Sequence, residues 1–204
     1  MRFEISSAVS AVALILWSSA VVAGTVRLDG PALVEAEAQA RTALASLAEG
    51  TPTFDATQAF TVTEVETRWQ VLPARYAPKP PVPLANVDHC ALVILQPDRP
   101  AQVVRTVGSG YTESLGCTGF DAIAFTDLDG DGRIEIAVIQ STLAPPDRYL
   151  RTPVVVRHRA DETFAVDETL SAALDEQGGI TTIAALRRAV AKRRGTGSPP
   201  RRRP

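Results

Sequence analysis

The residues best suited to chemistry lie between Asp127 and Glu135, where acidic side chains recur within one short segment. The acids are Asp127, Asp129, Asp131 and Glu135. Ca²⁺ binds six to eight oxygen atoms, and carboxylates are among its preferred ligands. Gly130 and Gly132 allow tight turns between the acids, because glycine accepts positive φ. Since four crowded carboxylates would repel one another without a cation, the sequence predicts a Ca²⁺ site.

Two other interpretations of this segment fit its residues less well than a calcium loop. An EF-hand requires a bidentate Glu at its twelfth position, where this chain has Val138. Residues 122–125 and 134–138 are also typical of strands, whereas an EF-hand is flanked by helices. A simple Asp-Gly turn in a hairpin is the remaining alternative, but such a turn does not require three spaced aspartates and a later glutamate.

The segment Phe125 to Val138 resembles the calcium loop of FG-GAP repeats of the VCBS type, which occur in integrin α-chains. In that family a strand, an acidic loop and an apolar strand form a hairpin of a β-propeller blade. The resemblance covers residues 121–139, in one copy, and Glu135 stands where the family usually has Asp. It implies the following ligands: the side chains of Asp127, Asp129, Asp131 and Glu135, and the carbonyl of Arg133.

The fold expected around this hairpin is α+β. A closed propeller needs at least about four blades, and the chain has strands for about one. We therefore expect a mainly antiparallel β meander, one sheet resembling a propeller blade, with N- and C-terminal helices packed on it. The alternative is a propeller completed by other subunits.

Hydrophobic periodicity and turn residues place the other elements. A helix is predicted from Leu33 to Ala48, with Pro31 at its start. A strand is expected from Phe60 to Leu72, followed by an extended loop from Pro73 to Pro83. A last helix begins after Thr182, which can cap it. Further strands are predicted at Ala91–Leu95, Gln102–Val107, Ala122–Phe125, Ile134–Ile139, Val154–His158 and Phe164–Val166.

The N-terminal segment 1–23 is typical of a signal peptide. It has an early Arg2, an apolar run and small residues up to Ala23, after which cleavage is expected. The run is interrupted by serines and is shorter than the ~20 apolar residues of a spanning helix. The mature protein is thus predicted to be periplasmic or secreted, and not transmembrane after cleavage.

Cys90 and Cys117 are the two cysteines of the chain. In an oxidising compartment an even number of cysteines favours a disulfide, and the alternative is two buried free thiols.

The charge distribution excludes a typical nucleic-acid-binding protein. Between Gly24 and Leu186 the chain carries 22 acidic and 12 basic side chains, whereas the rest, from Arg187, has eight basic side chains and no acid. Residues 24–194 are predicted to form a single domain, and residues 195–204 a disordered basic tail. This tail is either simply solvated or in weak contact with anionic surfaces.

Other side chains give weaker signals. His89 and His158 share no spacing that indicates a zinc site. Trp69, Tyr76 and Tyr111 could stack on a sugar ring, but aromatic residues are only 5% of the chain, and core packing is the simpler interpretation.

Three functions fit these features. The preferred hypothesis is a non-enzymatic exported domain, whose Ca²⁺ stabilises a loop used in contact with an unidentified protein or glycan. The alternatives are a calcium-assisted extracytoplasmic hydrolase, for which the sequence identifies no general base, and an envelope-associated structural protein held by its arginine-rich tail.

Overall fold

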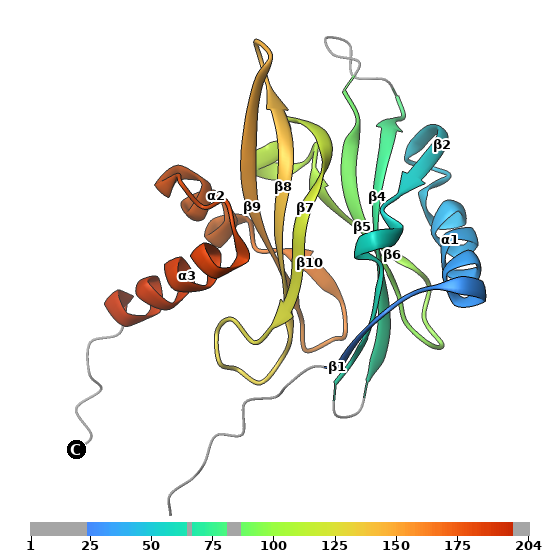
Figure 1. Ribbon diagram of the computed structural model, residues 1–204, viewed down its shortest axis with the longest axis horizontal. Coiled ribbons are helices and arrows are strands. Elements are labelled where there is room, and N and C mark those ends of the chain that lie inside the picture. Colours follow the sequence, from blue (N-terminus) through green and yellow to red (C-terminus); the bar gives the residue numbers. More distant parts are fainter. Residues whose placement is uncertain (1–23, 65–66, 81–86, 198–204) are drawn as a thin grey trace, which may run out of the picture.

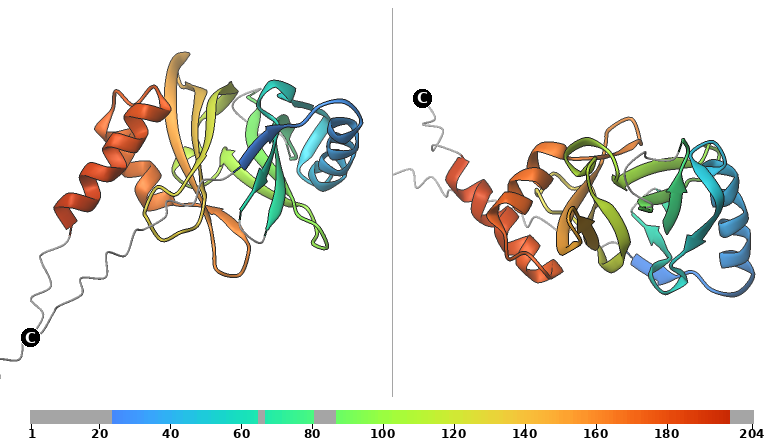
Figure 2. Two further views of the ribbon diagram at one scale, coloured as in Figure 1. Left: turned by 60° about the horizontal axis from the view of Figure 1, so that its bottom comes forward. Right: turned by 90° about the horizontal axis from the view of Figure 1, so that it is seen from above.

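The computed structural model describes residues 24–64, 67–80 and 87–197. The described chain forms four layers: a helix, two antiparallel sheets face to face, and a pair of helices (Figure 1). Figure 2 shows the same order of layers from two further directions. The fold class predicted from the sequence, α+β with antiparallel strands and helices packed on them, is confirmed. The strands, however, form two sheets where one was expected.

The first sheet is built from the N-terminal half of the described chain. Its strand order is β1-β3-β4-β5-β6, and β2 also pairs with β4. The strands are β1 (Gly24–Arg27), β2 (Ala48–Phe54), β3 (Phe60–Thr63), β4 (Arg68–Pro78), β5 (His89–Leu95) and β6 (Gln102–Val107). Helix α1 (Gly30–Leu44) covers the outer face of this sheet.

The second sheet has the strand order β10-β9-β8-β7. Its strands are β7 (Gly116–Thr126), β8 (Glu135–Ala144), β9 (Arg148–His158) and β10 (Phe164–Val166). Helices α2 (Glu168–Gln177) and α3 (Ile183–Gly197) cover its outer face. Two short 3₁₀ helices, Ala56–Gln58 and Gly110–Thr112, lie in the connections.

Each sheet has apolar side chains on both faces, which explains the unbroken apolar runs in the sequence. All seven residues of β5 are buried. One set of side chains packs under α1, and the alternate set packs between the sheets. Trp69 lies in this central core with Phe125 and Phe164, its ring centroid 5.7 Å and 4.8 Å from theirs.

Local residues fix where the helices begin. Pro31 lies in the first turn of α1, as predicted. The side chain of Thr182 accepts a hydrogen bond from the backbone N–H of Ala185 at 3.2 Å and so caps α3, also as predicted. Asp167 caps α2 by accepting from the N–H of Leu170 at 3.0 Å. Helix α2 was not predicted.

Polar contacts and a disulfide join the two sheets. The predicted pairing of Cys90 on β5 with Cys117 on β7 is confirmed by their geometry, with Cα atoms 5.6 Å apart. Gln140 on β8 is fully buried; its amide donates to the Thr106 carbonyl at 3.0 Å and accepts from the Thr106 hydroxyl at 2.9 Å. At the sheet edges, the Gln102 side chain hydrogen-bonds the backbone N–H and carbonyl of Phe164, in the manner of a strand.

Two local predictions were wrong. Phe60–Leu72 is not one strand, because the chain turns after β3, where the N–H of Glu64 donates to the Thr67 carbonyl at 2.9 Å. The expected loop from Pro73 is the continuation of β4 to Pro78. Pro73 is accommodated because it lies where β4 changes its neighbour from β3 to β2, between Val71 and Ala74, so its missing N–H breaks no regular pair on that side, while on the other side it lies opposite Leu92 of β5.

The ends of the first and last helices differ from those predicted. Helix α1 ends at Leu44, four residues before the predicted end, since Ala48 begins β2. Helix α3 includes residues 195–197, the start of the expected tail. The predicted signal peptide, residues 1–23, and residues 198–204 of the tail lie outside the described residues.

Candidate metal centre

The acidic loop connects two paired strands of the second sheet. Thr126 at the end of β7 faces Glu135 at the start of β8, so the intervening residues must reverse direction within a short span. Gly130 and Gly132 adopt φ of 74° and 91°, which glycine accepts without a Cβ clash. The loop lies at the same end of the sandwich as the turn between β9 and β10 (Figure 1).

Side-chain carboxylates organise the loop backbone. Asp127 accepts hydrogen bonds from the N–H groups of Gly130 and Gly132. Asp129 accepts from the N–H of Asp131 at 3.1 Å, and Asp131 accepts from the N–H of Arg133 at 2.8 Å. These hydrogen bonds fold the loop into successive turns, in the manner of Asx turns.

Three of the predicted ligands converge. One carboxylate oxygen from each of Asp127, Asp129 and Glu135 lies within 4.8 Å of the others. Because Ca²⁺–oxygen distances are about 2.3–2.6 Å, two ligands on opposite sides of one ion are about 5 Å apart, and these oxygens fit around a single cation. An all-carboxylate set suits a hard ion such as Ca²⁺ or Mg²⁺ better than a soft metal.

The other two predicted ligands are the side chain of Asp131 and the backbone carbonyl of Arg133. The Asp131 carboxylate is not part of this cluster and is exposed at the loop tip. The Arg133 side chain turns toward the β9–β10 connection, where it contacts Glu162 at 3.2 Å and the Arg159 carbonyl at 3.0 Å. Its contacts anchor the second half of the loop.

Glu135 is the most deeply placed of the acids, with 2% of its surface exposed. The pKa of Glu135 is raised to about 7: burial is the main cause and the charges of Asp129, Asp131 and Asp127 add to it, while the hydrogen bond from the Leu128 N–H acts in the opposite direction. A buried carboxylate in this state gains most from a nearby positive charge, which would restore its ionised form.

Two arginines from outside the loop bind its first half. Arg157 on β9 forms ion pairs with Asp129 and with Asp167, the residue that caps α2; the Asp167 contact measures 2.6 Å. Arg194 on α3 donates to the Leu128 carbonyl at 3.2 Å. Asp129 therefore belongs to the acidic cluster and at the same time forms an ion pair with the guanidinium of Arg157.

A second group of ionisable side chains lies between the loop and the central core. His158 is buried, with Nε2 3.0 Å from Glu162 and Nδ1 3.6 Å from Glu64. Glu64 also accepts from the N–H of Ile134 at 3.3 Å. The His158 ring stacks on Phe164, with ring centroids 4.3 Å apart. These contacts connect the loop to the central core.

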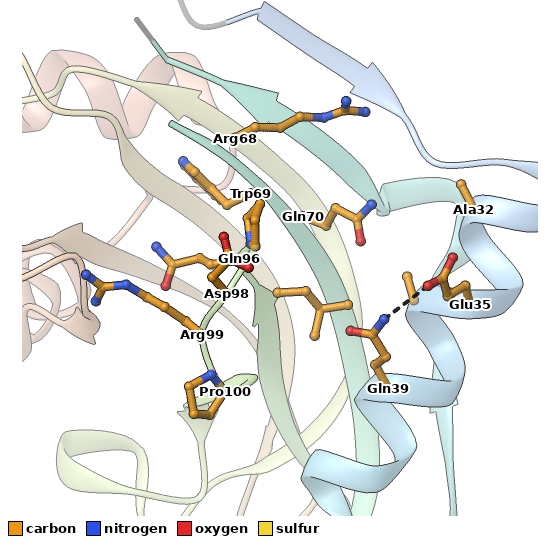
Figure 3. A pocket seen from close by; sticks show the side chains of 13 residues that line it. Ala32, Glu35, Gln39, Arg68, Trp69, Gln70, Gln96, Asp98, Arg99 and Pro100 are labelled. Atoms are coloured by element: carbon orange, nitrogen blue, oxygen red, sulfur yellow. Dashed lines mark hydrogen bonds between the residues drawn. The ribbon is translucent and has the colours of Figure 1, made fainter. Parts of the chain in front are cut away.

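A larger cleft lies away from the loop, between α1, the start of β4 and the β5–β6 turn. Its volume is about 660 Å³. Figure 3 shows side chains from all three segments around it, including Glu35, Gln70 and Arg99. Its lining combines polar and apolar side chains, and the aromatic residues considered for sugar stacking do not provide an exposed platform there. Trp69 and Tyr76 are buried, and the Tyr111 hydroxyl donates to the Pro153 carbonyl.

No protein-family model matches this chain, and neither a curated protein nor a solved structure is significantly similar to it. The FG-GAP resemblance thus stays a prediction carried by the loop residues. Among the helices of the described residues, none has the length and apolar character needed to cross a bilayer.

Sequence reasoning did not identify Arg157, Arg194 or the Glu64–His158–Glu162 group. Helix α2 and its cap could have been predicted from the sequence, because Asp167 precedes a helical apolar pattern that includes Leu170 and Leu174. The contact between Arg157 and Asp129 could not have been predicted in this way, since it depends on how β9 pairs in the sheet.

Proposed function

We propose that this chain is an exported calcium-binding domain that acts as a non-enzymatic interaction module. The observation that carries the proposal is the convergence of Asp127, Asp129 and Glu135 at a distance suited to one cation. The resemblance of the loop to FG-GAP repeats supports Ca²⁺ as the ion. The ion would neutralise the acidic cluster and fix the shape of the loop.

Export is supported by the N-terminal sequence and by the cysteine pair. A disulfide between Cys90 and Cys117 is stable in an oxidising compartment such as the periplasm or the extracellular space.

A contact role, rather than catalysis, is supported by the position of the histidines. His89 and His158 are both buried, and His158 is enclosed by Phe164 and Trp69. A general base must reach the proton that it removes from a substrate. The partner would be a protein or a glycan that contacts the ordered loop or the polar cleft beside α1.

Direct metal titration tests this proposal. We expect calorimetry on the oxidised, metal-free protein to show saturable Ca²⁺ binding, with weaker Mg²⁺ binding. Asp129→Asn should lower the Ca²⁺ affinity about tenfold or more, because the amide keeps an oxygen but loses the charge. The matched control is Asp161→Asn, since Asp161 also organises a turn, through Thr163, but lies outside the cluster. Equal Ca²⁺ affinity in the Asp129 variant and the wild type would contradict the ligand assignment.

A further inference from the structure

A second cavity opens directly beside the acidic loop, between the second sheet and the two C-terminal helices. Its volume is about 210 Å³. Four apolar side chains form most of its wall: Leu128 from the loop, Val155 from β9, Leu170 from α2 and Val190 from α3. The cavity therefore lies where the acidic loop, the second sheet and helices α2 and α3 come together.

Charged side chains complete the lining of this cavity. Arg157, Arg193 and Arg194 all line it, together with Asp129 and Glu135. The negative charge of Asp129 is paired with Arg157, which also pairs with Asp167, and Arg193 donates to the Ala173 carbonyl. A guanidinium has five N–H donors, so the hydrogen bond of Arg194 to the Leu128 carbonyl leaves donors that can reach an anion. Planar arginine groups match carboxylates well, because they can form two parallel hydrogen bonds.

The volume sets the size of the apolar part of an occupant. A dry apolar cavity of about 150 Å³ accommodates benzene, which has six carbons. A cavity of about 210 Å³ thus suits a hydrocarbon group of roughly six to eight carbons. We propose that this cavity binds a small carboxylate with such a hydrocarbon group, which fills the apolar wall while the carboxylate lies among Arg157, Arg193 and Arg194.

The position of the cavity connects this site to the metal loop. Asp129 and Glu135 belong both to the cavity lining and to the converging acids. On the basis of the proposed function, Ca²⁺ would neutralise these acids and strengthen the binding of an anion. By thermodynamic reciprocity the carboxylate would raise the Ca²⁺ affinity by the same factor.

The test is calorimetric titration of the oxidised protein with octanoate, acetate and octanol, first in EDTA. Each buried methylene should strengthen binding about fourfold, so octanoate should bind far more tightly than acetate. It should also bind more tightly than octanol, which has the same chain but no charge. Octanoate that binds no better than acetate, or no better than octanol, would overturn the proposal.

Variants separate the charged and apolar contributions. Arg194→Gln should weaken octanoate binding about tenfold and leave octanol binding unchanged. Arg187→Gln is the matched control, because Arg187 is exposed on the same helix and does not line the cavity. Leu170→Phe, at a half-buried position, should block octanoate, and its thermal unfolding shows that the fold is retained. Equal octanoate affinity in both arginine variants would refute the site.

Repeating the titrations in Ca²⁺ distinguishes the two proposals. Tighter octanoate binding in Ca²⁺ supports the coupling between cavity and loop. Calcium binding without octanoate binding refutes the cavity site and leaves the metal site intact. Octanoate binding that is identical in EDTA and Ca²⁺ refutes the coupling alone.

Discussion

Glu135→Gln should stabilise the metal-free protein at alkaline pH and remove much of its response to Ca²⁺. Glu135 is 2% exposed and lies among Asp127, Asp129 and Asp131. In the absence of a cation, its ionised form is disfavoured in the folded state. Glutamine keeps the oxygen that accepts from Leu128 and carries no charge.

The size of the effect follows from the pKa. In the folded protein the pKa of Glu135 is raised from 4.5 to about 7. Each pKa unit corresponds to about 1.4 kcal/mol, so ionisation of Glu135 costs about 3 kcal/mol of folding free energy. The folded state holds its proton more tightly than the unfolded state. The stabilising contribution is therefore complete below pH 4.5 and is lost as the pH rises through about 7.

Urea unfolding in EDTA at pH 4.5, 6 and 8 measures this directly. The difference in unfolding free energy between Glu135→Gln and the wild type should grow in favour of the variant by about 3 kcal/mol from pH 4.5 to 8. Glu113→Gln, at an exposed acid, is the control and should show no such trend. A Glu135→Gln protein that loses stability relative to the wild type as the pH rises would refute the reasoning.

Two further predictions concern the links between the sheets. Cys90→Ser and Cys117→Ser should each lower the unfolding free energy by about 3–4 kcal/mol, and the double variant by no more, because the cross-link closes a separation of 27 residues. Additive losses in urea unfolding would argue against a shared bond. Gln140→Leu should cost about 1–3 kcal/mol, because it removes two buried hydrogen bonds to Thr106 and leaves only the longer contacts of Thr106 with the Cys90 carbonyl and the Thr112 hydroxyl. Gln39→Leu, on the exposed face of α1, should change the thermal unfolding temperature little; similar shifts in both variants would contradict the role of the buried link.

The strands were the most predictable part of this fold. Runs such as Ala91–Leu95 and Val154–His158 are rich in β-branched or aliphatic residues, because their side chains are buried on both faces of a sheet. Because these strands are apolar on both faces, the division into two sheets could not be predicted from them. A run that is apolar throughout shows that a strand is covered on both sides, but it does not show which strands pair and which only pack.

The candidate site was predictable only in its local part. Asp127, Asp129 and Glu135 are close in sequence, so turn geometry alone brings them together. Arg157 reaches Asp129 only because β9 pairs with β8 and directs its side chain toward the loop. Long-range contacts of this kind depend on strand register, which a single sequence specifies weakly.

The division of the strands between the sheets has a consequence for the order of assembly. Every strand of the first sheet lies before residue 108, and every strand of the second follows residue 115. As the chain emerges with its N-terminus first, the first sheet can thus complete all its strand pairs before its inner face, which includes Trp69 and Ile94, is covered by the second sheet. Cys90 belongs to the early half and Cys117 to the late half. Oxidation of this pair therefore reports the moment at which the two halves meet.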